Sequence, residues 1–246
     1  MSTTPHSPEG FLLVNKPKGI SSHGCIAQIK RAIGRTHKIG HAGTLDPFAD
    51  GLLIVGIGRP YTKQLSQIMA YPKEYIAQGE LNLLTDTLDP TGKIVCTGRE
   101  EVSREQLEAA IKKMGASYEQ IPPIYSALKF KGQCLYKAAR IGRLSTEELE
   151  KITVQKKRIV QLYQLELVAF DPPYFTIKAR VSCGTYIRSL VNDIAGQCNT
   201  HATTKMLTRT EIGPFSLDNA AECTDIAAYW SEKGSWLETS FFRKEL

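Results

Sequence analysis

Runs of apolar residues between turn residues predict the strands of the chain. Residues 11–14 and 52–57 are short apolar runs of the kind found in buried strands. Residues 75–84 and 159–170 have strand patterns as well. At 175–181 every second residue is apolar, which predicts a strand with one face buried and the other exposed.

Apolar residues that step by three and four along the chain predict helices. Ser21 and Ser22 are candidate caps for the first helix, and Ser103 with Gln106 matches a capping box. Strands and helices mix without a regular βαβ unit or an internal repeat, so the expected fold class is α+β, with a mixed, largely antiparallel sheet flanked by helices. One expected helix follows Ser21 and Ser22 and is closed by Gly34, and another runs from Pro60 to about Met69. A third follows Ser103 and is closed by Gly115, a fourth contains 187–194 and ends at Gly196, and a further short one is expected at 220–230.

Composition sets the class of protein. The 246 residues suit one large domain or one and a half small ones, with an ordinary globular content of 42% hydrophobic and 23% charged residues. The first nine residues lack the basic and apolar regions of a signal peptide, and no stretch approaches the roughly 18 apolar residues of a membrane span. We therefore expect a soluble, cytoplasmic protein without membrane contact.

Cysteine spacing and charge narrow the possible ligands. The six cysteines show no metal-binding spacing, so neither a structural zinc nor a disulfide framework is expected. The net charge is +6, and basic residues cluster at 129–143 and 156–158. Such clusters suit a polyanion, although both can equally be solvated faces.

The segment 40–47 (GHAGTLDP) has the composition of an active site on a loop. Its glycines allow unusual dihedrals or a close approach of the backbone to a ligand. Asp46 precedes a proline, which disfavours helix and places the carboxylate on extended or turn backbone, and His41 lies five residues earlier. The alternative is an aspartate that only stabilises its own turn.

Three other segments combine turns with side chains that could bind a ligand. Arg188 falls in the first turn of a predicted helix, where the dipole does not favour a cation, so a partner elsewhere is expected. Tyr75 begins a strand, and the segment 122–129 joins a double proline to an aromatic and a basic residue, as in nucleic acid stacking. The alternatives are a surface arginine, a buried aromatic and a rigid linker.

Together these segments resemble one family. GHAGTLDPFADGLL (40–53) is similar to the active-site motif of TruB-type pseudouridine synthases, usually written GHTGTLDPxAxGLL. The resemblance spans about residues 11–215. Further matching segments follow in the family's order: NKPKGISS (15–22), KEY (73–75), TDTLDPTG (85–92), PPIYSALK (122–129), SCGTYIRSL (182–190) and TRTEIGPF (208–215).

The resemblance implies the pseudouridine synthase fold and the isomerisation of a uridine in RNA without a cofactor or metal. The family's catalytic aspartate matches Asp46, and the arginine paired with it matches Arg188. Asp46 could attack C1′ of the ribose, attack C6 of the base, or abstract the C2′ proton. Each route needs an ionised carboxylate at the sugar, which Arg188 is expected to orient.

The resemblance also implies how the RNA is held. The target uridine must leave its stack to reach the carboxylate. Tyr75 is expected to stack on the flipped base, Leu207 to form an apolar wall beside it, and His41 to take the place that the base left. Further residues expected to bind the substrate are Lys16, Tyr186, Lys129 and Arg209.

The segment 129–151 matches an insertion that closes over the RNA loop in the family. Its basic residues would neutralise phosphates: Lys129, Lys131, Lys137, Arg140 and Arg143. The alternative is a surface insertion without function. Three positions depart from the family pattern, with Ala42 in place of threonine, Cys183 in place of a frequent lysine and Thr208 in place of arginine.

The expected organisation is a disordered start (1–9), a catalytic domain (10–218) with the insertion, and a short extension (219–246) too small for the RNA-binding PUA domain of many relatives. The expected partner is the TΨC stem-loop of tRNA, modified at uridine 55 by a monomer without a guide RNA. Two alternatives are an RNA chaperone in which catalysis is secondary or lost, and a synthase acting on ribosomal RNA or with a guide RNA.

Overall fold

The computed structural model of the protein describes residues 9–34, 37–126, 128–130, 133–135 and 144–226. The chain divides into two compact units, one formed by Met1–Glu74 with Thr208–Leu246 and the other by Tyr75–Leu207. Strands β4 (Lys73–Leu81) and β12 (Ala202–Ile212) each have residues in both units. Of the start expected to be disordered, residues 1–9, the first eight lie outside the described part.

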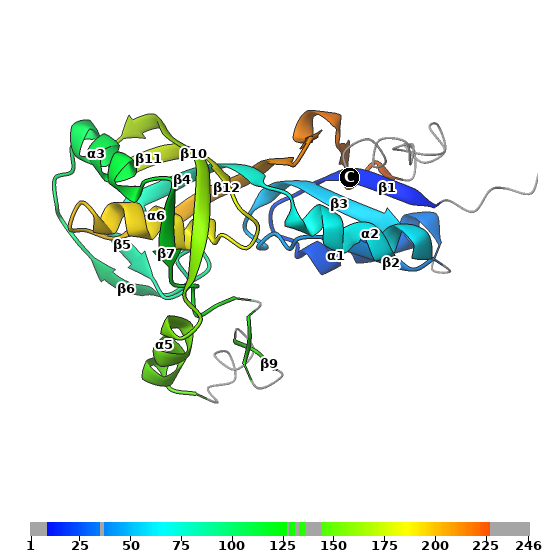
Figure 1. Cartoon of the computed structure of the whole chain (residues 1–246), viewed down its shortest axis with the longest axis horizontal. Coiled ribbons are helices and arrows are strands. Elements are labelled where there is room, and N and C mark those ends of the chain that lie inside the picture. The colour runs from blue at the N-terminus through cyan, green and yellow to red at the C-terminus, as the bar shows by residue number, and fades with distance from the viewer. Residues whose placement is uncertain (1–8, 35–36, 127, 131–132, 136–143, 227–246) are drawn as a thin grey trace, which may run out of the picture. The chain divides into compact units, whose positions relative to one another are not determined.

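The first unit is built on an antiparallel ladder between β1 (Gly10–Lys16) and β3 (Asp50–Ile57) (Figure 1). Alternate residues of these strands face opposite sides, so each side can bury a helix. One side packs on α1 (Ser22–Ile33) and includes Leu12 and Val14. The other packs on α2 (Arg59–Ala70) and includes Phe11 and Leu13.

Four short elements complete the first unit. β2 (Ile39–Ala42) pairs antiparallel with β3, and β14 (Ala221–Glu222) lies parallel to β1. β13 (Phe215–Ser216) pairs with β12 and is followed by a 3₁₀ turn, η1 (Leu217–Asn219). The helix expected at 220–230 is therefore wrong over its first residues, because Ala221 instead pairs its backbone with Val14 on β1.

The second unit has the strand order β12-β4-β11-β10-β7. β11 (Tyr174–Val181) and β10 (Arg158–Asp171) form a long hairpin, and β7 (Ser117–Gln120) pairs with the start of β10. Helices α3 (Arg104–Met114) and α6 (Ile187–Gly196) also belong to this unit (Figure 1). The alternation predicted for 175–181 is confirmed, because its odd-numbered residues are buried and its even-numbered ones are partly exposed.

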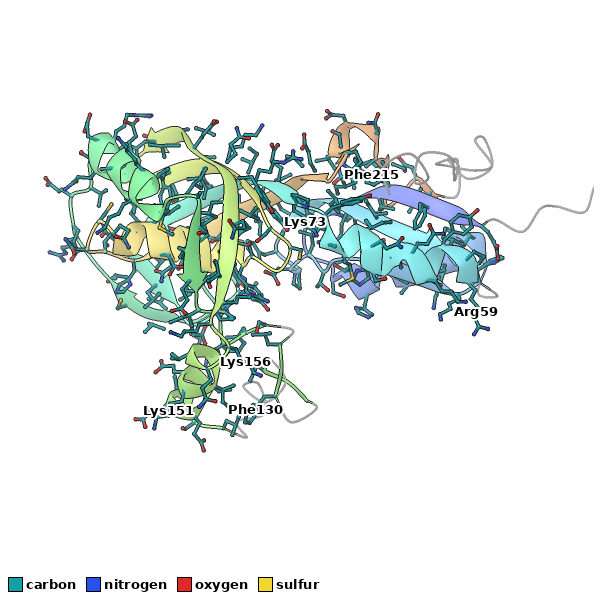
Figure 2. The ribbon with its side chains drawn as sticks, in the orientation of Figure 1. Arg59, Lys73, Phe130, Lys151, Lys156 and Phe215 are labelled. Atoms are coloured by element: carbon teal, nitrogen blue, oxygen red, sulfur yellow. The ribbon has the colours of Figure 1, made fainter. Side chains whose placement is uncertain are left out.

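Two smaller sheets belong to the second unit as well. β5 (Leu83–Thr85) pairs with β6 (Ile94–Thr97). In the predicted insertion, β8 (Lys129–Phe130) pairs with β9 (Gln133–Cys134), and α5 (Thr146–Val154) follows. Phe130 and Lys151, labelled in Figure 2, lie on this segment. Its own small core contains the buried residues Leu135, Leu149 and Ile152.

The four longer predicted helices and the α+β fold class are confirmed. The capping box of Ser103 and Gln106 is present at α3, and Ser21 caps α1 by accepting from Gly24 N. Most strand pairs are antiparallel. Among the helices that the structure describes, none has the length and apolar character required to cross a membrane.

Candidate active site

Asp46 lies on the loop between β2 and β3, half-buried, and the backbone around it is held on both sides. The hydroxyl of Ser22 accepts from Leu45 N at 2.9 Å and donates to Leu45 O at 3.1 Å. After the aspartate, Pro47 O accepts from Gly19 N at 2.7 Å. These bonds fix the backbone that carries the carboxylate, so the loop 43–49 (the Asp46 loop) is pre-organised.

Two buried cations support the Asp46 loop through its carbonyl groups. Lys16 is 0% exposed, and its ammonium donates to Ala49 O at 2.6 Å, to Ile20 O at 2.9 Å and to Pro17 O at 2.8 Å. An ammonium has three donors, so these carbonyls take up all of them. Burial lowers the pKa of Lys16, against the opposing effect of the nearby Cys25 and acidic groups.

Arg209, on β12, is the second of these cations and is 1% exposed. Its Nη2 donates to Gly43 O at 3.1 Å and its Nε donates to Leu52 O at 2.8 Å, so it joins the two sides of the Asp46 loop. Gly51 permits this approach, because a Cβ there would lie 2.4 Å from the Arg209 carbonyl oxygen. Substrate binding by Lys16 and Arg209 stays a prediction; both side chains are placed to shape the loop.

His41 lies on β2, half-buried, with its ring edge against His23 at a centroid distance of 5.3 Å. Burial is the main cause that lowers its pKa, and the nearby His23 and Arg209 act in the same direction. The imidazole is therefore held in its neutral form at neutral pH. A neutral, partly exposed aromatic ring is chemically suited to stacking among bases, the role expected of His41.

Tyr75 and Leu207 belong to the second unit, on β4 and β12, and are 8% and 4% exposed. Lys73, two residues before Tyr75, is anchored in the first unit. Its ammonium donates to the carbonyls of Met69 and Tyr71. Lys73 is labelled in Figure 2. Stacking by Tyr75 and an apolar wall at Leu207 stay predictions.

Arg188 is in the first turn of α6 and is 3% exposed, so the alternative of a surface arginine is wrong. Its Nη2 donates to Tyr125 O at 2.9 Å, and its Nη1 donates to Thr87 O. The same Nη1 lies 3.4 Å from the carboxylate of Asp89. A partner elsewhere, expected from the position of Arg188 in its helix, is thus confirmed within the second unit.

Asp89 is a buried carboxylate that the sequence interpretation did not single out, although it lies in the matched segment TDTLDPTG. One oxygen accepts from Thr87 Oγ1 at 2.8 Å, from Thr91 N at 2.9 Å and from Thr91 Oγ1 at 2.6 Å. The other faces Arg188. A buried carboxylate needs both a counter-charge and hydrogen-bond donors, and Asp89 has both.

Tyr186 precedes α6, and its ring lies 5.0 Å from the guanidinium carbon of Arg158, in cation–π geometry. Lys129 lies on β8, and nothing further is described of its side chain. Residues Lys131, Lys137, Arg140 and Arg143 lie outside the described residues. Phosphate binding by these basic residues stays a prediction.

Of the three departures from the family pattern, the structure explains the surroundings of two, Ala42 and Thr208. Ala42 is fully buried on β2 among the apolar side chains that cover α2, where a hydroxyl would need a partner. Thr208 donates its hydroxyl to Asp50 in the first unit. Cys183 is exposed, and nothing in the structure explains it.

The first unit thus brings Asp46 together with Lys16 and Arg209, and the second brings Arg188 together with Asp89. Comparison with known proteins identifies the family of the chain. A family model described as TruB family pseudouridylate synthase (N terminal domain) matches residues 30–187. A tRNA pseudouridine synthase B of Protochlamydia amoebophila is 36% identical over 92% of this chain and 82% of its own length.

Another relative and a solved structure support the same assignment. A tRNA pseudouridine synthase B of Fusobacterium nucleatum is 40% identical over 85% of this chain and 70% of its own length. The crystal structure of a Cbf5-Nop10-Gar1 complex contains a chain with 26% identity and a TM-score of 0.69. That match covers 97% of this protein but only 60% of the solved chain. The protein belongs to the TruB family of pseudouridylate synthases.

Proposed function

We propose that this enzyme converts uridine to pseudouridine in tRNA, at uridine 55 of the TΨC loop. The relatives of P. amoebophila and F. nucleatum that it matches over most of their length are named as tRNA enzymes. The observation that carries the proposal is the pre-organised loop that presents Asp46, held by Ser22, Lys16 and Arg209. A loop fixed before substrate binding presents its carboxylate without a reorganisation cost.

The reaction breaks the C1′–N1 bond of one uridine and joins C1′ to C5 of the same base, so the product contains the same atoms as the substrate. Asp46 acts as the carboxylate at the ribose, and Arg188 holds it ionised and oriented. Tyr75 stacks on the flipped base, and His41 fills the space that the base leaves in the RNA.

The protein acts on tRNA alone, as a monomer in the cytoplasm, without a guide RNA. The solved relative with Cbf5 is a complex with two other proteins, but its identity of 26% is lower than the 36% and 40% of the relatives named for tRNA. Purified protein and an unmodified tRNA transcript should therefore be sufficient for product formation.

The test is to map pseudouridine in that transcript after incubation with the wild type and with Asp46→Asn. We expect the product at uridine 55 with the wild type and none with the variant, while the Kd for tRNA stays the same. Asp225→Asn is the matched control, because Asp225 is an exposed carboxylate of the same unit. Product formation by Asp46→Asn would refute the role of Asp46, and an inactive wild type would favour an RNA chaperone or a guide-dependent enzyme.

A further inference from the structure

The start of α6 is held by a side chain from another strand. Gln120, the last residue of β7, is 0% exposed. Its Nε2 donates to the carbonyl oxygen of Tyr186 at 3.0 Å, and its Oε1 accepts from Tyr186 N–H at 2.8 Å. One side-chain amide thus satisfies both backbone polar groups of Tyr186, as the backbone of a neighbouring strand would.

This pairing stands in for a helix cap. Tyr186 is the N-cap residue of α6, with φ −93° and ψ 112°, and its own side chain makes no capping hydrogen bond. The Tyr186 carbonyl also accepts the first helical bond, from Leu190 N at 3.0 Å. Because Gln120 holds both backbone groups of this residue, it sets where α6 begins and therefore how its first turn is placed.

Two more contacts join α6 to β7 and to the residue that follows it. The hydroxyl of Ser189 donates to Ile121 O at 3.0 Å. The hydroxyl of Tyr118 donates to Asp193 Oδ2 at 2.9 Å and accepts from Gln120 Nε2 at 2.6 Å. The helix is thus tied to one short stretch of chain at its cap, its first turn and its second turn.

We propose that Gln120 is a positioning residue for the isomerisation, acting through the Tyr186 backbone on the placement of Arg188. The Arg188 guanidinium must reach two carbonyls and the Asp89 carboxylate at once, so a shift in the helix start changes all three contacts. This inference rests on the proposed function, since its consequence is read in the rate of pseudouridine formation. Gln120 itself is not a catalytic residue, because the contacts described for it are to protein groups.

The experiment measures single-turnover pseudouridine formation with the enzyme in saturating excess over an unmodified tRNA transcript. In this regime an inactive fraction of enzyme does not change the rate constant. Gln120→Met keeps the length of the side chain and removes both hydrogen bonds to Tyr186. We expect a rate constant lower by about tenfold, the effect of losing one or two buried hydrogen bonds in the reacting geometry, and an unchanged Kd for tRNA.

A second variant and a control keep the test decisive. Gln120→Asn keeps both amide groups on a side chain one methylene shorter, so it weakens the pairing with Tyr186 without burying a charge. Its rate constant should lie between those of the wild type and Gln120→Met, and it decides the matter if Gln120→Met does not fold. Gln161→Met makes the same change on an exposed side chain of β10 and should leave the rate constant unchanged. Variants with a lower Tm but the wild-type rate constant would overturn the proposal. A wild type without activity would instead refute the proposed function.

Discussion

Two buried arginines, one in each unit, make similar contacts in different settings. Arg209 and Arg188 are 1% and 3% exposed, and both donate to two backbone carbonyls. The carbonyls that accept from Arg209 belong to Gly43 and Leu52, on either side of Asp46 in the sequence. Arg188 adds an ion pair with a buried carboxylate, Asp89. The same residue type at the same depth thus holds a backbone shape in one unit and a charge network in the other.

Both arginines are buried and bonded to carbonyls, so these properties do not separate an arginine that shapes the backbone from one with a proposed role in the reaction. What separates them is the group that the guanidinium faces. A change that removes a backbone-shaping contact should appear mainly in the free energy of unfolding. A change that removes the charge proposed to orient Asp46 should appear mainly in the rate.

The largest effect is expected for Arg188→Met. The single-turnover rate constant should fall by about 100- to 1000-fold, as for other pre-organised electrostatic groups, with a much smaller change in the Kd for tRNA. Stability should also fall, because Asp89 is left buried without its counter-charge. The double variant Arg188→Met/Asp89→Asn should recover the free energy of unfolding, measured in urea, but not the rate constant. Equal losses of rate and of tRNA affinity would count against the role of Arg188.

Arg209→Met should show the opposite pattern. Two carbonyls lose their donors, so the free energy of unfolding should fall by about 2–5 kcal/mol in urea titrations. The single-turnover rate constant of the remaining folded enzyme should fall by at most about tenfold, or 1.4 kcal/mol, because the loop that presents Asp46 keeps its hydrogen bonds to Ser22 and Lys16. Arg59→Met is the control, because Arg59 is exposed in the same unit (Figure 2). A normal stability together with a large loss of rate would show that Arg209 serves the chemistry directly.

A smaller, pH-dependent effect is expected in the second unit. Burial raises the pKa of Asp193 from 3.8 to about 6, partly offset by the hydrogen bond from Tyr118. The folded protein then binds this proton more tightly than the unfolded chain, so stability falls as the pH rises between these two values. Asp193→Asn should remove this decrease of stability with pH. The measurement is the midpoint of urea unfolding at a series of pH values between about 4 and 7. Parallel curves for the two proteins would contradict the shift.

The smallest effect, of opposite sign, is expected in the first unit. The pKa of His41 is lowered from 6.5, chiefly by burial. The unfolded chain binds this proton more tightly, so the contribution of His41 to stability is complete above the unfolded pKa and is lost as the pH falls below it. His41→Gln should make the melting temperature less sensitive to acid in this range. An unchanged acid sensitivity would show that His41 titrates normally.

Periodicity predicted the regular elements of the fold well. The four longer helices and the β11 alternation follow from local patterns, and α3 carries the predicted capping box. β2 was not predicted, because its four residues, Ile39–Ala42, include a glycine and show no alternation. The helix expected at 220–230 is wrong at its start, because pairing with an open strand edge, which no local pattern encodes, decides the conformation of Ala221.

The chemistry-bearing residues were found through motifs, but their supports were not. Gln120 pairs with a residue 66 positions away, and Arg188 bonds to a carbonyl 101 positions away. Ser22 holds the Asp46 loop across 23 positions, although it was read only as a helix cap. Such contacts depend on which segments the fold brings together, so one sequence alone does not reveal them.

The unit that contains Asp46 is assembled from two stretches of sequence, Met1–Glu74 and Thr208–Leu246. During translation the second stretch leaves the ribosome after the whole of Tyr75–Leu207. It brings the backbone that pairs with β3 and the Arg209 guanidinium that bonds to Gly43. A nascent chain stopped before this point would have the Asp46 carboxylate on an unfinished loop. Competence for the reaction should therefore arrive late in synthesis, and prematurely terminated chains should form no pseudouridine.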